Sequence, residues 1–298
     1  MQLDWTANRW TNCCYAAAGL ARGLPPADPR LAKALREPAR RLQQILAASD
    51  LPTAQFWQAT IAGTHQTDDP QMLARRALRR TVGLNRADES LVARIANAIA
   101  AVEAAAAEAL PTLTAELEHR GRPLRQLWEA RGPGLLNTIG QLTEPRLLAE
   151  RSTVVLVYPT FGGGGLASPR NGSVAIEALL TNINNRLPEV LRLGWLLSQL
   201  QQQPPVSAGQ SDNGRGAGQR FDELAALALL PPTLQAGEAV ELSSLAAETL
   251  AAAITSWRIN IVTSVDLPSV LLDWWSTYTQ TRPAWHVALG ALDRMLAG

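Results

Sequence analysis

The sequence predicts a mostly α-helical fold with a small β-sheet (α+β), in which a helical N-terminal half precedes a short sheet packed on a buried central helix. Three observations lead to this prediction. Apolar residues recur at helical spacing through residues 1–150. Residues 153–158 (TVVLVY) form a β-branched run closed by Pro159, as in a strand buried on both faces. Residues 187–203 then carry the most apolar helical pattern of the chain.

The chain divides by composition into a helical region, residues 1–145, and a mixed α+β region, residues 146–298. A sharp break at Gly132, Pro133 and Gly134 precedes the first strand. A length of 298 residues allows two domains of ordinary size or one large one. The change of composition therefore marks either a domain boundary or a change of secondary-structure content within one continuous domain.

The helical region contains the densest basic patch of the chain. Asp69 and Pro70 begin a helix, since an acidic cap followed by proline is a helix-start signal. One face of this helix carries four arginines: Arg75, Arg76, Arg79 and Arg80. They either bind phosphate or an acidic partner, or form a solvated face paired with local acids. The near-zero net charge of the chain favours the second interpretation.

A second strand is predicted in residues 173–181 (SVAIEALLT). Val174 and Ile176 fall on one side of the strand, and Glu177 falls on the other, wetter side, which predicts an edge strand. Residues 259–263 (INIVT) predict a third strand. The sheet is therefore expected to be small and flanked by helices.

The helix predicted at residues 187–203 is apolar around most of its circumference. Asn184 or Asn185 is expected to cap it, and Pro188 lies in its first turn, where proline is tolerated. Glu189, Arg192 and Gln199 share one narrow polar stripe. This stripe must face either water or a site.

The order strand, loop, edge strand and buried helix with an early glutamate resembles the layout of zincin-type metallopeptidases, whose central helix carries H-E-x-x-H. The matching five residues are 188–192, PEVLR. Glu189 matches the glutamate of the motif, whereas Pro188 and Arg192 stand at the two histidine positions. Neither proline nor a charged guanidinium can donate to zinc. The resemblance, which covers about fifty residues, implies a zincin-like fold whose metal site has been lost.

A glycine-rich loop lies between the first two strands. Gly162, Gly163, Gly164 and Gly165 bring backbone N–H groups close together, as in an anion cradle, and Arg170 follows in the same loop. The run opens no helix and has no following lysine, which favours a loop that simply crosses over the packed helix. A second loop, residues 204–218, is rich in proline and glycine and is expected to be mobile, either as a lid or as a surface insertion.

Composition argues against several function classes. A net charge of +1, balanced over both halves, argues against a nucleic-acid partner and an anionic membrane surface. The start of the chain has no signal-peptide pattern, so a cytoplasmic location is expected. Of the 27 basic residues only Lys33 is lysine, a bias typical of GC-rich bacterial genomes. Cys13 and Cys14 are adjacent, which favours two reduced thiols over a strained disulfide.

Two hypotheses of function follow. The common hydrolase, P-loop and zinc motifs are missing, and only three histidines occur, so no metal and no cofactor is expected. The first hypothesis is a non-catalytic, metal-free bacterial protein of zincin-like layout that acts through contacts with another protein. The second is a hydrolase or transferase whose site lies under residues 162–165, with Glu189 as acid or base and Arg192 as its anion-binding partner.

Overall fold

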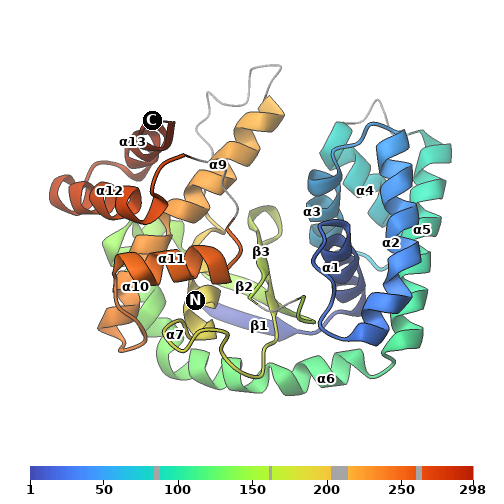
Figure 1. The fold of residues 1–298 in the computed structure, drawn as a ribbon, viewed down its shortest axis with the longest axis horizontal. Helices are drawn as coiled ribbons and strands as arrows, with labels where there is room; N and C mark the ends of the chain where they lie inside the picture. The colour runs from blue at the N-terminus through green and yellow to red at the C-terminus, as the bar shows by residue number, and fades with distance from the viewer. Residues whose placement is uncertain (84–87, 161–162, 203–213, 260–263, 298) are drawn as a thin grey trace.

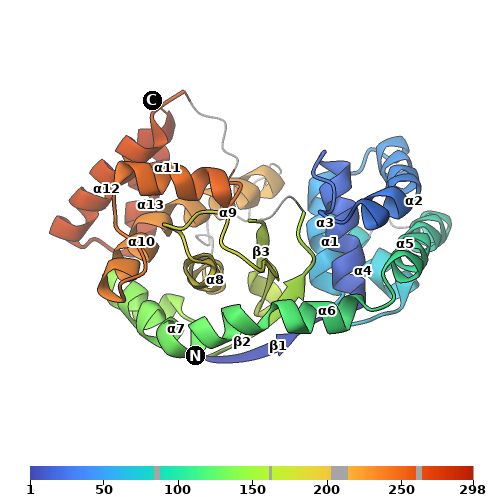
Figure 2. The ribbon, with the colours of Figure 1, turned by 60° about the horizontal axis from the view of Figure 1, so that its bottom comes forward.

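The computed structural model describes residues 1–83, 88–160, 163–202, 214–259 and 264–297. It shows the predicted fold class, a mostly helical protein with one small mixed sheet. The sheet lies in the middle of the molecule, between an N-terminal group of helices and a C-terminal group (Figure 1). Helices α6 and α7 run beneath the sheet and connect the two groups (Figure 2). Buried apolar side chains from all of these parts form one continuous core.

The strands are β1 (Gln2–Thr6), β2 (Arg151–Val157), β3 (Gly165–Ser168) and β4 (Ser173–Glu177). The N-terminal helices are α1 (Arg9–Ala21), α2 (Pro29–Ala48), α3 (Thr53–Gly63), α4 (Pro70–Val82) and α5 (Glu89–Ala109). The connecting helices are α6 (Leu113–Arg120), α7 (Arg122–Leu142) and the short 3₁₀ turns η2 (Pro145–Leu147) and η3 (Pro169–Asn171). The remaining helices are α8 (Glu189–Ser198), α9 (Gly214–Ala228), α10 (Leu230–Ala239), α11 (Ala247–Ser256), α12 (Leu267–Thr281) and α13 (Trp285–Ala297).

The sheet has the strand order β1-β2-β4-β3, with β1, β2 and β4 parallel and β3 antiparallel to β4. Two sequence predictions are corrected here. The first residues form strand β1 rather than the start of a helix, because Gln2–Thr6 pairs with Arg151–Val155. Strand β4 is not an edge strand: it is paired on both sides and all five of its residues are buried.

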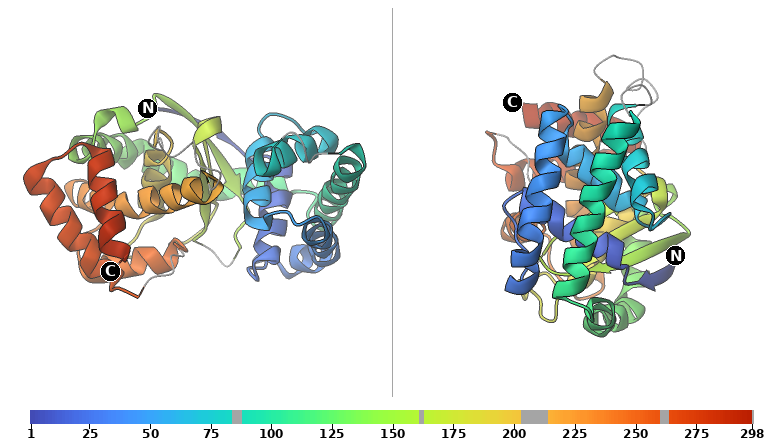
Figure 3. Two further views of the ribbon diagram at one scale, coloured as in Figure 1. Left: turned by 90° about the horizontal axis from the view of Figure 1, so that it is seen from above. Right: turned by 90° about the vertical axis from the view of Figure 1, so that its right-hand side faces the viewer.

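Helices α4 and α5 each begin at an aspartate cap. Asp69 Oδ1 accepts a hydrogen bond from the Gln71 amide at the start of α4, and Asp88 Oδ1 accepts one from the Leu91 amide at the start of α5. The helices then lie side by side, with α2 and α4 both against α5 (Figure 3). Helix α5 is the one described helix that is long and apolar enough to cross a membrane, and its buried face packs inside this group.

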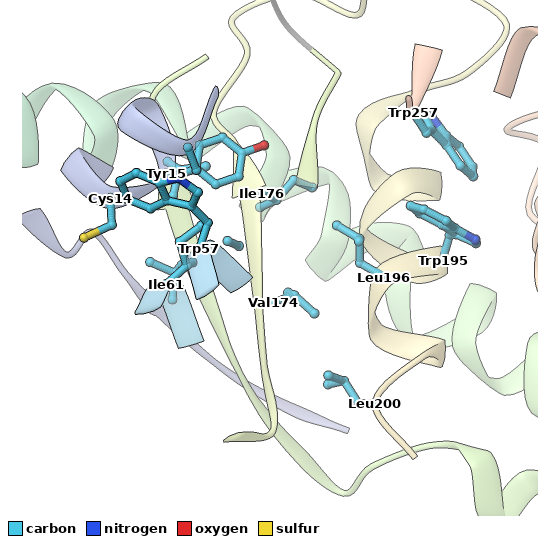
Figure 4. Close-up of a cluster of buried hydrophobic side chains, with 14 of the residues drawn as sticks. Cys14, Tyr15, Trp57, Ile61, Val174, Ile176, Trp195, Leu196, Leu200 and Trp257 are labelled. Atoms are coloured by element: carbon cyan, nitrogen blue, oxygen red, sulfur yellow. The ribbon is translucent and has the colours of Figure 1, made fainter. Parts of the chain in front are cut away.

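Helix α8 is buried against β3 and β4 on one side and α7 and α10 on the other. Figure 4 shows Leu196 of α8, and Leu200 just beyond the end of that helix, opposite Val174 and Ile176 of β4, while Tyr15 of α1 lies on the other side of the strands. The helix starts differently from the prediction. Pro188 itself stands at the cap position, and Asn182 rather than Asn184 or Asn185 accepts from the first amide.

Two predicted segments fall largely outside the described residues. Of the loop predicted at residues 204–218, residues 204–213 lie outside them, and residues 214–218 form the start of α9. Of the strand predicted at residues 259–263, residues 260–263 lie outside them.

Candidate functional site

Three of the predicted site residues, Gly164, Glu189 and Arg192, meet at the carboxyl end of β4. Four parts of the chain converge there: the start of α8, the glycine loop that leads into β3, the residues that follow β2, and α1. Parallel strands β2 and β4 end at this same edge of the sheet, where their backbone carbonyls need partners. The sequence places an arginine of α8 beside them.

Arg192 is completely buried, and its guanidinium donates hydrogen bonds to two backbone carbonyls. Nη1 lies 2.7 Å from the Gly164 oxygen and Nη2 lies 3.1 Å from the Glu177 oxygen. Nη2 also forms an ion pair with Glu189 Oε2, one helical turn earlier, in an orientation that gives no aligned hydrogen bond. Arg192 therefore ties the glycine loop and the end of β4 to helix α8.

Glu177 is the second buried charge of the cluster and is fully shielded from solvent. Its Oε1 atom accepts a 2.6 Å hydrogen bond from Thr160 Oγ1 and a 3.1 Å bond from the Tyr15 hydroxyl. Its Oε2 atom has no hydrogen-bond partner among the described residues. The carboxylate thus joins α1 to the end of β4 on the side of the sheet opposite to α8.

The glycines of the loop are required by close backbone packing. A Cβ at Gly164 would lie 2.4 Å from both Glu177 Oε1 and the Tyr15 hydroxyl oxygen. Gly163 has φ +83°, and a Cβ there would lie 2.2 Å from the Ser256 carbonyl oxygen. The Gly164 carbonyl oxygen points toward the cationic Arg192 guanidinium. Gly162 lies outside the described residues.

Burial dominates the electrostatics of the cluster. It raises the pKa of Glu189, and the charge of Glu177 adds to the rise while Arg192 opposes it. Burial and the neighbouring Glu177 carboxylate raise the pKa of the Tyr15 hydroxyl well above its ordinary range. Tyr15 therefore remains a neutral hydrogen-bond donor at every physiological pH.

The structure brings together some of the predicted site residues and separates others. Glu189, Arg192 and Gly164 are in one cluster, as the enzyme hypothesis requires. Arg170 lies in η3, at the far end of the β3–β4 pair from Gly165. Sequence reasoning placed Glu177 on a wetter face and missed Tyr15 and Thr160. A glutamate at the end of an otherwise apolar strand was the one available signal for this cluster.

The donor set at the start of α8 does not fit a zinc ion. Pro188 has no donor atom, and the Arg192 guanidinium is a cation already bonded to carbonyls. Within the described part of the chain, no three histidine, cysteine or acidic side chains converge as metal ligands would. No step of chemistry can therefore be derived through a metal here.

A surface hollow of about 590 Å³ lies elsewhere, between β1 and α7, with Trp5, Arg125 and Trp128 among its lining residues. It shares no residue with the Arg192 cluster. Comparisons of the chain with protein-family models, with curated proteins and with solved structures find no match.

Proposed function

We propose that the chain is a metal-free, non-catalytic bacterial protein of zincin-like layout that works in the cytoplasm through contacts with another protein. The observation that carries the proposal is the burial of Arg192. A catalytic or anion-binding arginine must reach its substrate, whereas both terminal nitrogens of Arg192 are committed to backbone carbonyls inside the fold. Arg192, together with its ion-pair partner Glu189, thus holds the glycine loop and the end of β4 against α8, an arrangement that we call the Arg192 clamp.

The segment 178–188, which joins β4 to α8, is the surface that we assign to partner contact. Leu180 is 57% exposed and Ile183 is 50% exposed, although both are large apolar residues. The segment is anchored at both ends, since the Ala178 amide donates to the Val157 oxygen and the Glu189 amide of α8 donates to Asn182 Oδ1. A fixed loop that displays apolar side chains binds with little loss of conformational entropy.

One observation favours the second candidate, a hydrolase or transferase that uses Glu189 as a general acid with Arg192 as its partner. Burial raises the pKa of Glu189, and a raised pKa is what a carboxylic acid needs in order to donate a proton near neutral pH. The two candidates make opposite predictions for the variant E189Q. The first predicts a change of stability alone, and the second predicts loss of turnover.

Metal content is the first test. The purified protein is analysed for zinc and iron, and its thermal unfolding is recorded with and without a chelator. We expect substoichiometric metal and an unchanged midpoint. Stoichiometric metal, or a midpoint that falls with chelator, would overturn the metal-free assignment, because a bound metal stabilises the folded state.

Activity and contact are tested separately. A panel of peptide, ester and phosphoester substrates is assayed with the wild type and E189Q; turnover that disappears in E189Q would replace the first candidate by the second. A photoreactive residue is placed at position 180, and at position 72 as control, because Met72 is also exposed but lies on α4. We expect one dominant cross-linked protein from position 180 only; equal labelling from both positions contradicts the assigned surface.

A further inference from the structure

The four arginines of α4 do not act as one patch, because Arg75 contacts α5 while Arg76 and Arg80 reach a different part of the chain. Arg75 faces α5, where its Nη2 atom lies 2.8 Å from Glu89 Oε2. Arg76 and Arg80 are four residues apart and so share a different face of the helix. This face is turned toward the connection between β3 and β4, where η3 lies.

Amide side chains link both of these arginines to that connection. Arg76 Nη1 donates to Gln66 Oε1 at 2.9 Å, and Gln66 Nε2 donates to Asn171 Oδ1 at 3.2 Å. Arg80 Nη2 donates to the same Asn171 oxygen at 3.4 Å. Asn171, the chain neighbour of Arg170, is therefore linked directly to Arg80 and through Gln66 to Arg76.

The turn that carries Arg170 is fixed at several points. The Asn171 side-chain amide donates to the Ala62 carbonyl at the end of α3. The Gly172 carbonyl accepts from Ser152 Oγ at 2.9 Å and from the Thr153 amide at 3.0 Å. The backbone at Arg170 is thus fixed next to Asn171, the residue that Gln66 and Arg80 contact, and no carboxylate takes part in these bonds.

The positive charges of Arg170 and Arg76 lie close enough to Arg80 to act on its guanidinium. Partial burial, the charge of Arg170 and the charge of Arg76 all lower the pKa of Arg80. None of the three forms an ion pair with any residue that the structure describes. One acid interacts electrostatically with Arg170, namely Asp222 of α9. Burial raises the pKa of Asp222, and the charge of Arg170 reduces this rise.

We propose that Arg76, Arg80 and Arg170 form a binding site for the phosphate group of a small ligand. Each guanidinium has five donors, and the hydrogen bonds to Gln66 and Asn171 use one donor each of Arg76 and Arg80. Several donors are therefore left for a tetrahedral oxyanion, whose charge would remove the mutual repulsion of the three cations. A cluster of three arginines in a chain of net charge +1 does not suit a nucleic-acid strand, which needs an extended basic track.

The test is calorimetric titration of the full chain with inorganic phosphate and with pyrophosphate at constant ionic strength. We expect saturable binding at one site. R80Q and R170Q are each expected to weaken it about tenfold, because each loses a charge-assisted hydrogen bond. D222N is expected to strengthen binding, since it removes a carboxylate that interacts with Arg170.

R75Q is the matched control, because it removes the same charge from the same helix on the face that pairs with Glu89. Its affinity is expected to equal that of the wild type. Absence of saturable binding, or an equal loss in R75Q and R80Q, overturns the proposal and leaves only a basic helix face. Melting curves of all variants show whether a loss of binding is a loss of folding. The outcome is independent of whether the chain is catalytic.

Discussion

Replacing Arg192 with methionine keeps an unbranched, flexible side chain but shortens it and removes the charge and the five donors of the guanidinium. The variant leaves the buried Glu189 carboxylate without its cation and takes a donor from the carbonyls of Gly164 and Glu177. Removing one partner of a buried ion pair lowers the free energy of unfolding by about 3–5 kcal/mol. This range includes the cost of the two backbone carbonyls that lose their donor. For a chain of 298 residues, a loss of 4 kcal/mol lowers the melting temperature by about 6 °C.

The loss has a pH signature that distinguishes it from poorer packing. Without Arg192 the pKa of Glu189 rises further, because burial and the charge of Glu177 then act unopposed. A carboxyl group whose folded-state pKa is raised contributes stability at low pH and loses it as pH rises through that pKa. The R192M deficit is therefore expected to shrink as the pH falls from neutral toward the ordinary pKa of a glutamate. The double variant E189Q/R192M should lose this pH dependence.

Urea unfolding followed by circular dichroism, at several pH values, measures these effects. The matched control is R40M, because Arg40 forms an ion pair with Glu37 at the same spacing in the chain but on the surface. Its midpoint is expected to equal that of the wild type. If R192M unfolds like R40M, or if its deficit is constant with pH, the clamp described above is refuted.

Three further predictions concern the glycines, the adjacent cysteines and the start of α13. G164A is expected to lose about 1–3 kcal/mol by overpacking, whereas G290A, which has open space around its Cβ in α13, should gain up to about 1 kcal/mol in denaturant unfolding. Contact with Cys14 and burial raise the pKa of the Cys13 thiol, so a thiol reagent should label the two cysteines only after unfolding. The Glu144 carboxylate accepts a hydrogen bond from the first amide of α13. Burial alone would raise the pKa of Glu144, but its hydrogen bonds outweigh burial, so the pKa is lowered. E144Q should therefore melt below the wild type at neutral pH and converge with it in acid, where that contribution is lost.

The sequence allowed the central helix and the first interior strand to be predicted because both have strong local signals. The run TVVLVY became β2, and the apolar pattern of residues 187–203 became α8. The predicted sides of β4 also hold, since Val174 and Ile176 face α8 while Glu177 reaches Tyr15. These features depend on spacing within one segment, which the sequence shows directly.

Features that depend on distant partners could not be predicted. Strand β1 alternates between intermediate and exposed residues, and nothing near it in the sequence announces β2 as its partner. Strand β4 was expected at an edge because Glu177 seemed to require water. Its carboxylate instead finds Thr160 and Tyr15, the latter 162 residues away. The burial of Arg192 has the same cause, since its acceptors are backbone atoms that no side-chain pattern reveals.

Strand β1 and helix α1 contact residues 151–158, so they lie at the two ends of a long loop of the chain that contains α2 to α7. Asn12 holds the Leu156 carbonyl and the Tyr158 amide at separations of 144 and 146 residues. Helices α2 to α5 contact mainly one another and are local in sequence, so they can assemble before β2 exists. The sheet and the Glu177 cluster can form only after the ends of this long loop have come together. Loop closure costs conformational entropy before the contacts that stabilise the sheet are made. Folding is therefore expected to run from the helical group toward the sheet, with the Arg192 clamp among the last contacts to form.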